Sequence, residues 1–279
     1  MNILIIGGNG MLGKVIVSEF LKSSKNILYP TSSEMNLYNK ENITNYFNEN
    51  SIDYIIHCAG FTNVNEAENN INAYKINCES MYWLVNECRN RSIPLLYFST
   101  DYVFDGIKKI PYKEEDKKNP LNTYGMTKAI SEDIITSNLS DYRIIRLSWL
   151  FGESQKCFPE KIISKLKEGN EFHVVCDQIG SPTYVKDISA TIRDLINLPT
   201  GIYHLSNSGH TSWYDFAILI ADYLNLEKSL LKKSYSNTFD CIVKRPVNSI
   251  LDNTKIAKYD IKLKSYVMSV KEYLSKYKI

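Results

Sequence analysis

The chain has 279 residues, of which 44% are hydrophobic and 23% are charged, and its 33 basic and 31 acidic residues give a formal net charge of +2. This is the composition of an ordinary globular protein, long enough to bury a sizeable core as one large domain or two closely joined ones. Because the charges nearly balance and form no long block, nucleic acid or an anionic membrane surface is not expected as the main partner.

Strand and helix signals alternate along the first half of the chain. Short apolar runs predict strands, and apolar residues at helical spacing predict the helices between them. This alternation indicates an α/β fold, a doubly wound parallel sheet of the Rossmann type covered by helices on both faces. The expected strands are 2–6, 26–29, 53–59, 95–99 and 142–149, and the expected helices are 11–21, 39–50, 66–90 and 122–137.

The glycine-rich segment Gly7-Gly8-Asn9-Gly10-Met11-Leu12-Gly13 follows the first expected strand and opens the first helix. It fits G-x-G-x-x-G from Gly8, in the context that this motif requires. Glycines permit a tight turn and a close approach of the backbone to a pyrophosphate. The segment therefore predicts a dinucleotide site, although a glycine turn that binds nothing is the alternative.

The end of the second strand bears on which dinucleotide binds. An acidic residue about 20 residues beyond the glycine loop commonly binds the ribose of NAD. Here Pro30-Thr31-Ser32-Ser33 carries no carboxylate, and Glu34 is expected to lie past the ribose. Because three hydroxyls repel a 2′-phosphate less than an aspartate does, the sequence favours NADPH, with NADH as the alternative. No arginine is evident there.

Further polar groups lie at expected strand ends, where ligands of parallel sheets bind. His57-Cys58-Ala59-Gly60 closes the third strand; its small residues would admit a dinucleotide or serve sheet packing, and His57 is expected in the core. The Thr100 hydroxyl closes the fourth strand and can hydrogen-bond a carbonyl oxygen. Tyr124 and Lys128 share one helix face. The lysine can lower the phenol's pKa from about 10, so beside a nicotinamide the set predicts a ketone–alcohol redox site.

After residue 150 the pattern is less regular, so we divide the chain softly into a dinucleotide-binding domain, 1–150, and a mainly substrate-binding lobe, 151–279, with segments that return to the first domain. Gly169 is expected to end a helix, and Ser212 to begin one. The expected helices are 158–167, 185–198, 213–224 and 265–277, and the expected strands are 172–176 and 201–205.

The N-terminus and the cysteines favour a cytoplasmic protein. No signal peptide is expected, because Ile3 to Ile6 is a short apolar run, and no run approaches the roughly 20 residues of a membrane span. The cysteines form no Cys-x-x-Cys pair and fall mostly in apolar runs, so buried, reduced thiols are expected. These are Cys58, Cys78, Cys88, Cys157, Cys176 and Cys241.

Longer strings make one resemblance specific. Ser99-Thr100-Asp101-Tyr102-Val103-Phe104-Asp105-Gly106 and Pro120-Leu121-Asn122-Thr123-Tyr124-Gly125, with Lys128, resemble the extended short-chain dehydrogenase/reductase superfamily, and most closely its dTDP-4-dehydrorhamnose reductase family. Further similar strings cover nearly the whole chain. They are 61–68, 146–152, 177–183, 201–205 and 245–249.

The resemblance implies a role for each matching residue. Tyr124 would protonate a C4 oxygen as hydride arrives, Lys128 would hold the nicotinamide ribose, and Thr100 would bind the keto oxygen with Asp101 beside it. Trp149 would pack on the sugar or its nucleotide. The residues implied to line the cofactor, besides Tyr124 and Lys128, are Gly7, Gly10, Met11, Leu12, Gly13, Asn36, Leu37, Ala59, Gly60 and Phe61.

Three other positions leave alternatives open. Arg245 resembles a phosphate clamp, since guanidinium binds diphosphate in a fork, or it forms a surface ion pair. Asn77 could belong to the superfamily's asparagine–water proton relay, or be a solvated or capping residue. Some family members bind Mg²⁺ between subunits through a glutamate where this chain has Val15. We therefore expect no metal there, and whether the chain forms a homodimer stays open.

The resemblance implies NAD(P)H-dependent reduction of the 4-keto group of a nucleotide-activated 6-deoxyhexose. The first candidate substrate is dTDP-4-dehydro-L-rhamnose, and its product, dTDP-L-rhamnose, would feed surface polysaccharide synthesis. The alternatives are a reductase of a different 4-keto sugar nucleotide and a non-catalytic regulatory subunit of the same fold, such as the regulatory partner of methionine adenosyltransferase. The set of Thr100, Tyr124 and Lys128 favours catalysis.

Overall fold

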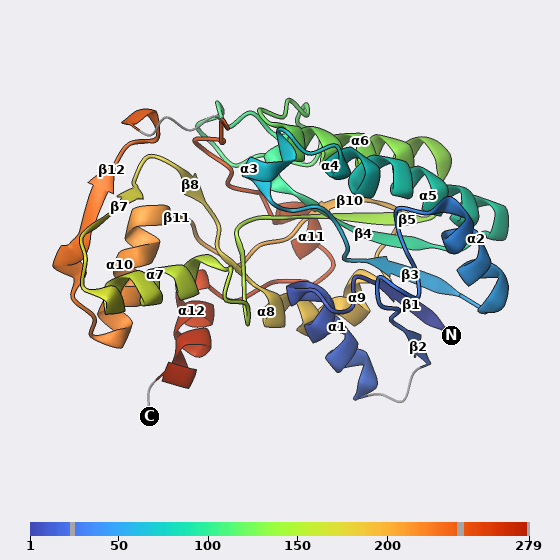
Figure 1. Ribbon diagram of the computed structural model, residues 1–279, viewed down its shortest axis with the longest axis horizontal. Coiled ribbons are helices and arrows are strands. Elements are labelled where there is room, and N and C mark those ends of the chain that lie inside the picture. The colour runs from blue at the N-terminus through green and yellow to red at the C-terminus, as the bar shows by residue number, and fades with distance from the viewer. Residues whose placement is uncertain (23–25, 239–242, 278–279) are drawn as a thin grey trace.

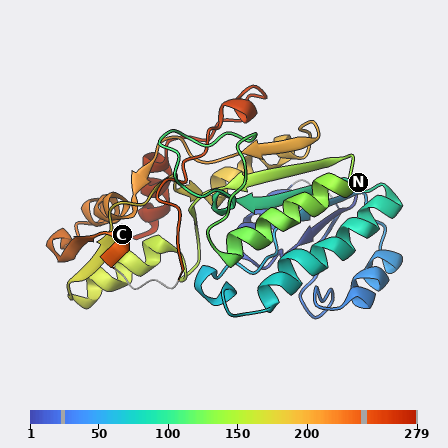
Figure 2. The same ribbon diagram turned by 90° about the horizontal axis from the view of Figure 1, so that it is seen from above.

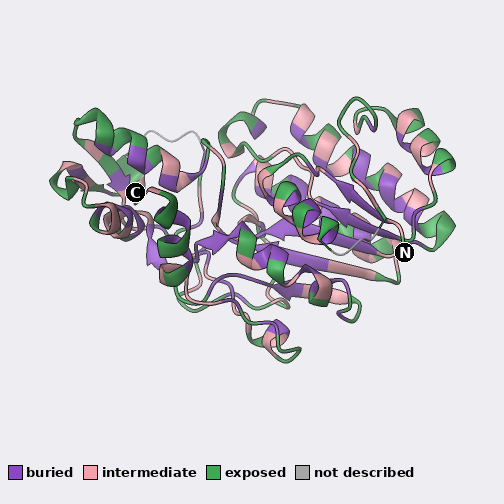
Figure 3. Ribbon diagram, turned by 90° about the horizontal axis from the view of Figure 1, so that it is seen from below, coloured by how far each residue is buried: buried purple, intermediate pink, exposed green. Residues whose placement is uncertain are grey.

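The computed structural model describes residues 1–22, 26–238 and 243–277. Its centre is a parallel six-stranded sheet with the order β10-β5-β4-β3-β1-β2 (Figure 1). The strands are mostly buried, as near-continuous apolar runs in a covered sheet should be (Figure 3). In chain order they are β1 (Ile3–Ile6), β2 (Ile27–Leu28), β3 (Tyr54–His57), β4 (Leu95–Thr100), β5 (Tyr142–Leu147) and β10 (Gly201–His204).

Helices cover both faces of this sheet, which confirms the predicted doubly wound fold (Figures 1 and 2). One face carries α2 (Lys40–Glu49), α5 (Ser80–Arg91) and α6 (Thr123–Asn138). The other carries α1 (Met11–Leu21), α8 (Val185–Ala190) and α9 (Ile192–Leu195). The short α11 (Thr254–Ala257) contacts β10.

The later residues form a smaller lobe beside the sheet (Figure 1). Its helices are α7 (Phe158–Glu168), α10 (Trp213–Leu224) and α12 (Tyr266–Leu274). As expected, Gly169 ends α7 at φ 74°, and the Ser212 side chain caps α10. Its short strands pair two by two: β6 (Leu150–Phe151) with β9 (Thr183–Tyr184), β7 (Phe172–Val175) with β12 (Leu231–Ser234), and β8 (Ile179–Gly180) with β11 (Thr211–Ser212). Its 3-10 turns are η3 (Lys228–Leu230), η4 (Ser236–Thr238) and η5 (Ser275–Tyr277).

Two helices predicted as continuous are broken. The expected helix 66–90 is α3 (Val64–Ala67), α4 (Asn72–Tyr74), the π-helical turn η1 (Lys75–Glu79) and α5. Asn70 accepts from the Asn72 N–H in the gap, a local bond that competes with the helix ladder. In the expected helix 185–198 the break is at Thr191, whose hydroxyl donates to the Ile188 carbonyl.

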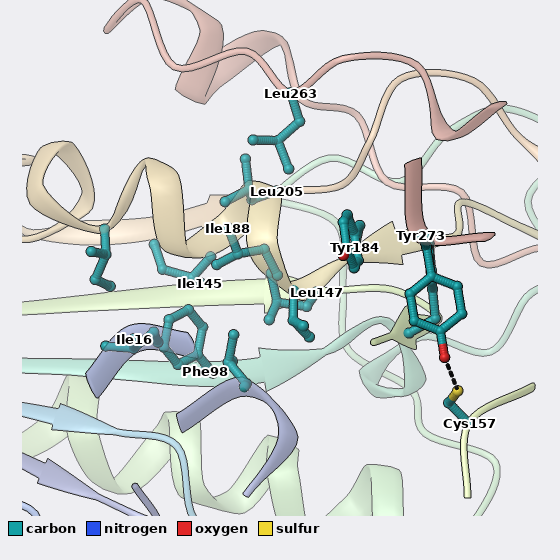
Figure 4. Packing of buried hydrophobic residues seen from close by; sticks show 14 of the residues in the cluster. Ile16, Phe98, Ile145, Leu147, Cys157, Tyr184, Ile188, Leu205, Leu263 and Tyr273 are labelled. Carbon is teal, nitrogen blue, oxygen red and sulfur yellow. Dashed lines mark hydrogen bonds between the residues drawn. The ribbon is translucent and has the colours of Figure 1, made fainter. Parts of the chain in front are cut away.

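One buried cluster joins the sheet to the smaller lobe. Figure 4 shows it running from Ile16 of α1, past Phe98 and Leu147, to Tyr184 and Tyr273 in the lobe. The sheet and the smaller lobe therefore share one hydrophobic core.

The thiols and apolar helices test two further expectations. Cys88 and Cys157 are buried and free as predicted, whereas Cys58, Cys78 and Cys176 are free but only half-buried; Cys241 lies outside the described residues. Cys58 and Cys176 directly follow β3 and β7, where the chain leaves a strand, and Cys78 lies in the π-helical turn η1. Within the described part of the chain, no helix combines the length and apolarity needed to cross a membrane.

Candidate active site

The glycine loop forms the predicted turn between β1 and α1. Gly7 has φ 82°, a conformation that favours glycine, and its carbonyl accepts from the Gly10 N–H at 3.0 Å. A Cβ at Gly13 would lie 2.1 Å from the Gly7 oxygen, whereas one at Gly10 would meet only that oxygen, at 3.3 Å. Gly10 is the N-cap of α1 and offers no side-chain bond to it, so the first N–H groups of α1 can bind an anion.

The other residues implied to line the cofactor differ in how exposed they are and in which atoms can reach it. Met11 lines the cleft, but the Leu12 side chain is in the core, so Leu12 has only its backbone to offer there. Asn36 is exposed, and Leu37 is half-buried against the core. The remaining three, Ala59, Gly60 and Phe61, are half-buried and follow β3 beside the glycine loop, with the Ala59 nitrogen 2.6 Å from a Cβ built on Gly7.

The structure corrects the sequence interpretation of the end of β2. Glu34 was expected to lie past the ribose, but its carboxylate turns back toward residues 30–33 and accepts from the Thr31 N–H at 2.7 Å and the Thr31 hydroxyl at 2.9 Å. These hydrogen bonds hold the pKa of Glu34 below its ordinary value. A negative charge therefore lies at the end of β2, and the preference for NADPH argued from its absence loses that support.

Thr100 and Asp101 lie buried where β4 passes into the 3-10 turn η2 (Asp101–Val103). The Thr100 hydroxyl donates to Asp101 Oδ1 at 3.0 Å and accepts from the Tyr102 N–H at 3.2 Å. The Ser148 hydroxyl donates to Asp101 Oδ2 at 2.9 Å, and Ser249 also hydrogen-bonds this carboxylate. Burial raises the pKa of Asp101 to about 6, against the opposing effect of these hydrogen bonds.

Tyr124 and Lys128 lie on one face of α6, as predicted, but they are not partnered as expected. Burial raises the pKa of Tyr124 above its ordinary value, and the Thr100 hydrogen bond opposes this rise. Lys128 Nζ donates to the Phe98 carbonyl oxygen at 2.7 Å and lies 4.0 Å from the Tyr97 ring centroid. Burial lowers the pKa of Lys128 to about 7. The side chain that lowers the pKa of Tyr124 is thus Thr100, and not Lys128 as the sequence predicted.

The start of α6 is fixed from three directions. Asn122 caps the helix by accepting from the Gly125 N–H at 2.8 Å and also donates to the Lys244 carbonyl at 2.9 Å. Glu68 accepts from the Thr123 N–H at 2.8 Å and the Thr123 hydroxyl at 2.9 Å, a favourable charge at a helix N-terminus. These contacts set the position of the next residue, Tyr124.

A buried ion pair, which the sequence analysis did not identify, holds α6 to the sheet. Arg146 of β5 donates to both carboxylate oxygens of Glu132, at 2.9 and 2.8 Å, and the Ser99 hydroxyl donates to the same carboxylate at 2.6 Å. Both charged side chains are at most 2% exposed. The sequence signal for the pair was a glutamate one helical turn after Lys128 and an arginine inside a strand.

Asn77 proves to be buried rather than solvated. Its amide donates to the Phe61 carbonyl and accepts from the Phe61 N–H, and it donates to the Thr127 hydroxyl at 2.8 Å. It therefore ties the segment after β3 to α6. His57 is buried as expected, and burial lowers its pKa to about 3.

A cleft of about 1400 Å³ lies between the sheet's carboxyl edge and the smaller lobe, and both Thr100 and Tyr124 line it. On the lobe side Trp149, at φ 46°, stacks on Trp213 with centroids 3.5 Å apart and planes 4° apart. A Cβ on Gly180 would lie 2.3 Å from the Trp149 ring, so glycine is needed beneath it. Trp213 was missed because only the tertiary fold brings it to Trp149.

Arg245 lines the same cleft from the chain segment that follows β12. Its guanidinium donates to the Asn65 side-chain oxygen at 2.7 Å and hydrogen-bonds Tyr102. Both partners are neutral, so the charge of the guanidinium is not paired by them. Within the described residues Arg245 does not form the surface ion pair that the sequence left open. Val15 is half-buried against the core, and no group of three potential metal-ligating side chains gathers in the described ranges.

Comparisons with known proteins find similarity over nearly the whole chain. The family model described as RmlD substrate binding domain matches residues 1–279. The chain is 33% identical to the spore coat polysaccharide biosynthesis protein SpsK of Bacillus subtilis, covering 98% of this chain and 96% of that protein. It is 33% identical to a dTDP-4-dehydrorhamnose reductase of Aggregatibacter actinomycetemcomitans, covering 91% of each. The structure of the Bacillus anthracis dTDP-4-dehydrorhamnose reductase in complex with NADP has a TM-score of 0.93 at 32% identity, covering 99% of both chains.

Proposed function

The chain belongs to the RmlD substrate binding domain family, and we propose that it reduces the 4-keto group of a nucleotide-activated 6-deoxyhexose with NADPH or NADH. The single observation that carries the proposal is that Thr100 and Tyr124 line a cleft with aromatic and cationic groups opposite, with Lys128 buried one helical turn after Tyr124. The first candidate substrate is dTDP-4-dehydro-L-rhamnose, because relatives that align over most of the chain bear the matching name.

The residues around the glycine loop fit a dinucleotide. Gly7 packs against the Ala59 backbone and Gly13 against the Gly7 carbonyl too closely for any side chain, which keeps the loop tight, and the uncapped start of α1 supplies N–H donors for a pyrophosphate. Lys128 would bind the nicotinamide ribose. When bound, the nicotinamide supplies a hydride, and with it two electrons, to the C4 carbon of the keto sugar. NADPH is favoured over NADH by the relative solved with NADP, not by the end of β2.

Tyr124 supplies the proton that the reaction requires. As the new C–H bond forms, the π electrons of the carbonyl move to its oxygen, and the Tyr124 O–H bond breaks as the oxygen takes that proton. The resulting phenolate regains a proton from solvent. A positioned general acid is typically worth about 10²–10⁴-fold. A hydrogen bond from Thr100 opposes the rise in the pKa of Tyr124 that burial causes, and so favours the phenolate.

The lobe side of the cleft would bind the rest of the substrate. Arg245 carries a cationic fork that matches a diphosphate, and the Trp149–Trp213 pair offers an apolar face to a sugar or base. This division assigns chemistry to residues 1–150 and recognition mainly to 151–279. The name of the Bacillus subtilis relative supports a product used in surface polysaccharide synthesis, and the free cysteines support a cytoplasmic location.

The test is a panel of 4-keto sugar nucleotides that vary in base and sugar, each followed by loss of NADPH or NADH absorbance. We expect turnover with dTDP-4-dehydro-L-rhamnose. Turnover only with another member of the panel would reassign the substrate but keep the reaction. Dinucleotide binding without turnover of any member would contradict the proposal and favour a regulatory subunit.

A further inference from the structure

The Thr100 hydroxyl is already committed to a protein partner, Asp101, which lines the same cleft. A hydroxyl has one proton and two lone pairs. In the structure that proton is donated to Asp101 Oδ1, and one lone pair accepts from the Tyr102 N–H. Tyr124 lies near the same hydroxyl, which affects the pKa of its phenol. While Asp101 is ionised it can only accept, so Thr100 has no proton left for a substrate oxygen.

We propose that Asp101 is a positioning residue that acts through Thr100: only when its carboxyl group is protonated can Thr100 donate a hydrogen bond to the keto oxygen. A protonated Asp101 can donate to Thr100 Oγ1 and so release the threonine's own proton toward the cleft. This inference rests on the proposed function. It differs from the role implied by resemblance, in which Asp101 lies beside Thr100 at the substrate.

The surroundings of Asp101 suit such a switch. Asp101 is 3% exposed, and Ser148 of the loop after β5 donates to Oδ2, the carboxylate oxygen that Thr100 does not contact. Ser249 also lowers the pKa of this carboxyl group. These neutral hydroxyls can donate to a carboxylate or accept from a carboxylic acid, so either state of Asp101 is accommodated. A buried aspartate bonded to a lysine or arginine would stay ionised instead.

The charge of Asp101 also acts on the phenol. The titratable groups that face it are Tyr124 of α6 and Tyr102 of η2, and Arg245 from the segment after β12 faces Tyr102. An ionised Asp101 raises the pKa of Tyr124 and makes it a weaker acid. Protonation of Asp101 therefore strengthens Tyr124 as a proton donor and frees Thr100, and both effects favour reduction of the ketone.

The sign of the pH dependence follows. The pKa of Asp101 is raised to about 6, so the competent, protonated form prevails below that pH and is lost as pH rises through it. The kcat/KM for reduction should then fall by up to about tenfold per pH unit above this pKa. Ser148 favours the ionised form, so removing its hydroxyl should move the fall to higher pH.

The experiment compares the pH profiles of kcat/KM for the wild type, Asp101→Asn, Ser148→Ala and Ser249→Ala. An asparagine amide can donate to Thr100 at every pH, so D101N should lose the fall near pH 6 and exceed the wild type at pH 8. S148A and S249A should keep the fall but shift it upward. A wild-type profile without this fall, an unmoved fall in D101N, or serine variants with wild-type midpoints would overturn the inference.

A second readout needs no substrate. In protein labelled with ¹³C at aspartate carboxyls, the Asp101 signal, identified by its loss in D101N or its shift in S148A, should titrate near pH 6 in the wild type and higher in S148A. A signal that stays ionised down to pH 4 would overturn the switch while leaving the reductase intact. Absence of turnover with every keto sugar would instead overturn the proposed function, and the inference with it.

Discussion

On the sheet side of the cleft, the proposed reacting groups are held by buried polar contacts, whereas the lobe side is built from stacked rings and cationic side chains that include Arg245. Lys128 is 4% exposed and hydrogen-bonded to a strand carbonyl, and its helix is tied to β5 through Glu132 and Arg146. Opposite them, Trp149 rests on Trp213 by ring stacking. If the proposed roles hold, the chemistry lies on rigid elements and the recognition of substrate on contacts that can rearrange at lower cost.

The largest effect should come from the glycine loop. Gly10→Val should abolish dinucleotide binding, a loss of at least about hundredfold, because its side chain would enter the space proposed for the pyrophosphate while the fold tolerates a Cβ there. Titration calorimetry with NADPH measures this, and Gly10→Ala, with the smallest side chain, is the control. Unchanged affinity in the valine variant would remove the cofactor from this loop.

The rigidity of the sheet side is tested by Glu132→Gln. Removing one partner of a buried pair leaves Arg146 uncompensated, which typically costs about 3–5 kcal/mol of unfolding free energy. Asp133→Asn is the matched control, because the neighbouring carboxylate is 66% exposed and its pair with Lys118 should contribute less than about 1 kcal/mol. Equal losses in urea unfolding of the two variants would mean that the buried pair does not anchor α6.

The lobe side should respond differently. Arg245→Ala should raise KM for the sugar nucleotide by about 10–100-fold and change kcat less, because a bond made equally to substrate and transition state is lost. Arg245→Lys keeps the charge but lacks the planar fork of the guanidinium, so its KM should lie between those of the wild type and the alanine variant. An unaltered KM in the alanine variant would place Arg245 outside the substrate site.

The smallest effect concerns cofactor choice. Glu34→Gln removes the charge at the end of β2 and should raise the kcat/KM of NADPH relative to NADH by no more than about tenfold, or ~1.4 kcal/mol. Thr31→Val removes a hydroxyl partner but keeps the charge, and it serves as the control. The same ratio in the glutamine variant and the wild type would show that Glu34 does not face the ribose.

Features set by local spacing could be predicted from the sequence, and features set by tertiary contacts could not. The glycine loop, Thr100 at its strand end and the shared face of Tyr124 and Lys128 depend on neighbours within one strand–helix unit. The stacking of Trp213 on Trp149 joins residues far apart in the chain, and the return of Glu34 to Thr31 depends on a side-chain rotamer. Periodicity carries neither kind of information.

The predicted interaction, in which the Lys128 ammonium lowers the pKa of the Tyr124 phenol, was wrong for a related reason. Helical spacing places two side chains on one face but does not say which acceptor each will find. The Phe98 carbonyl on β4 competes for the Lys128 ammonium, and the Thr100 hydroxyl, from the same strand, bonds the phenol.

The central claim is that Tyr124 donates the proton in reduction of a 4-keto sugar nucleotide. The most direct test is single-turnover loss of NADPH absorbance with dTDP-4-dehydro-L-rhamnose for the wild type and Tyr124→Phe, with cofactor affinity measured in parallel. Because only the hydroxyl is removed, we predict a rate lower by about 10²–10⁴-fold with nearly unchanged NADPH affinity. A near-wild-type rate in Tyr124→Phe would contradict the account.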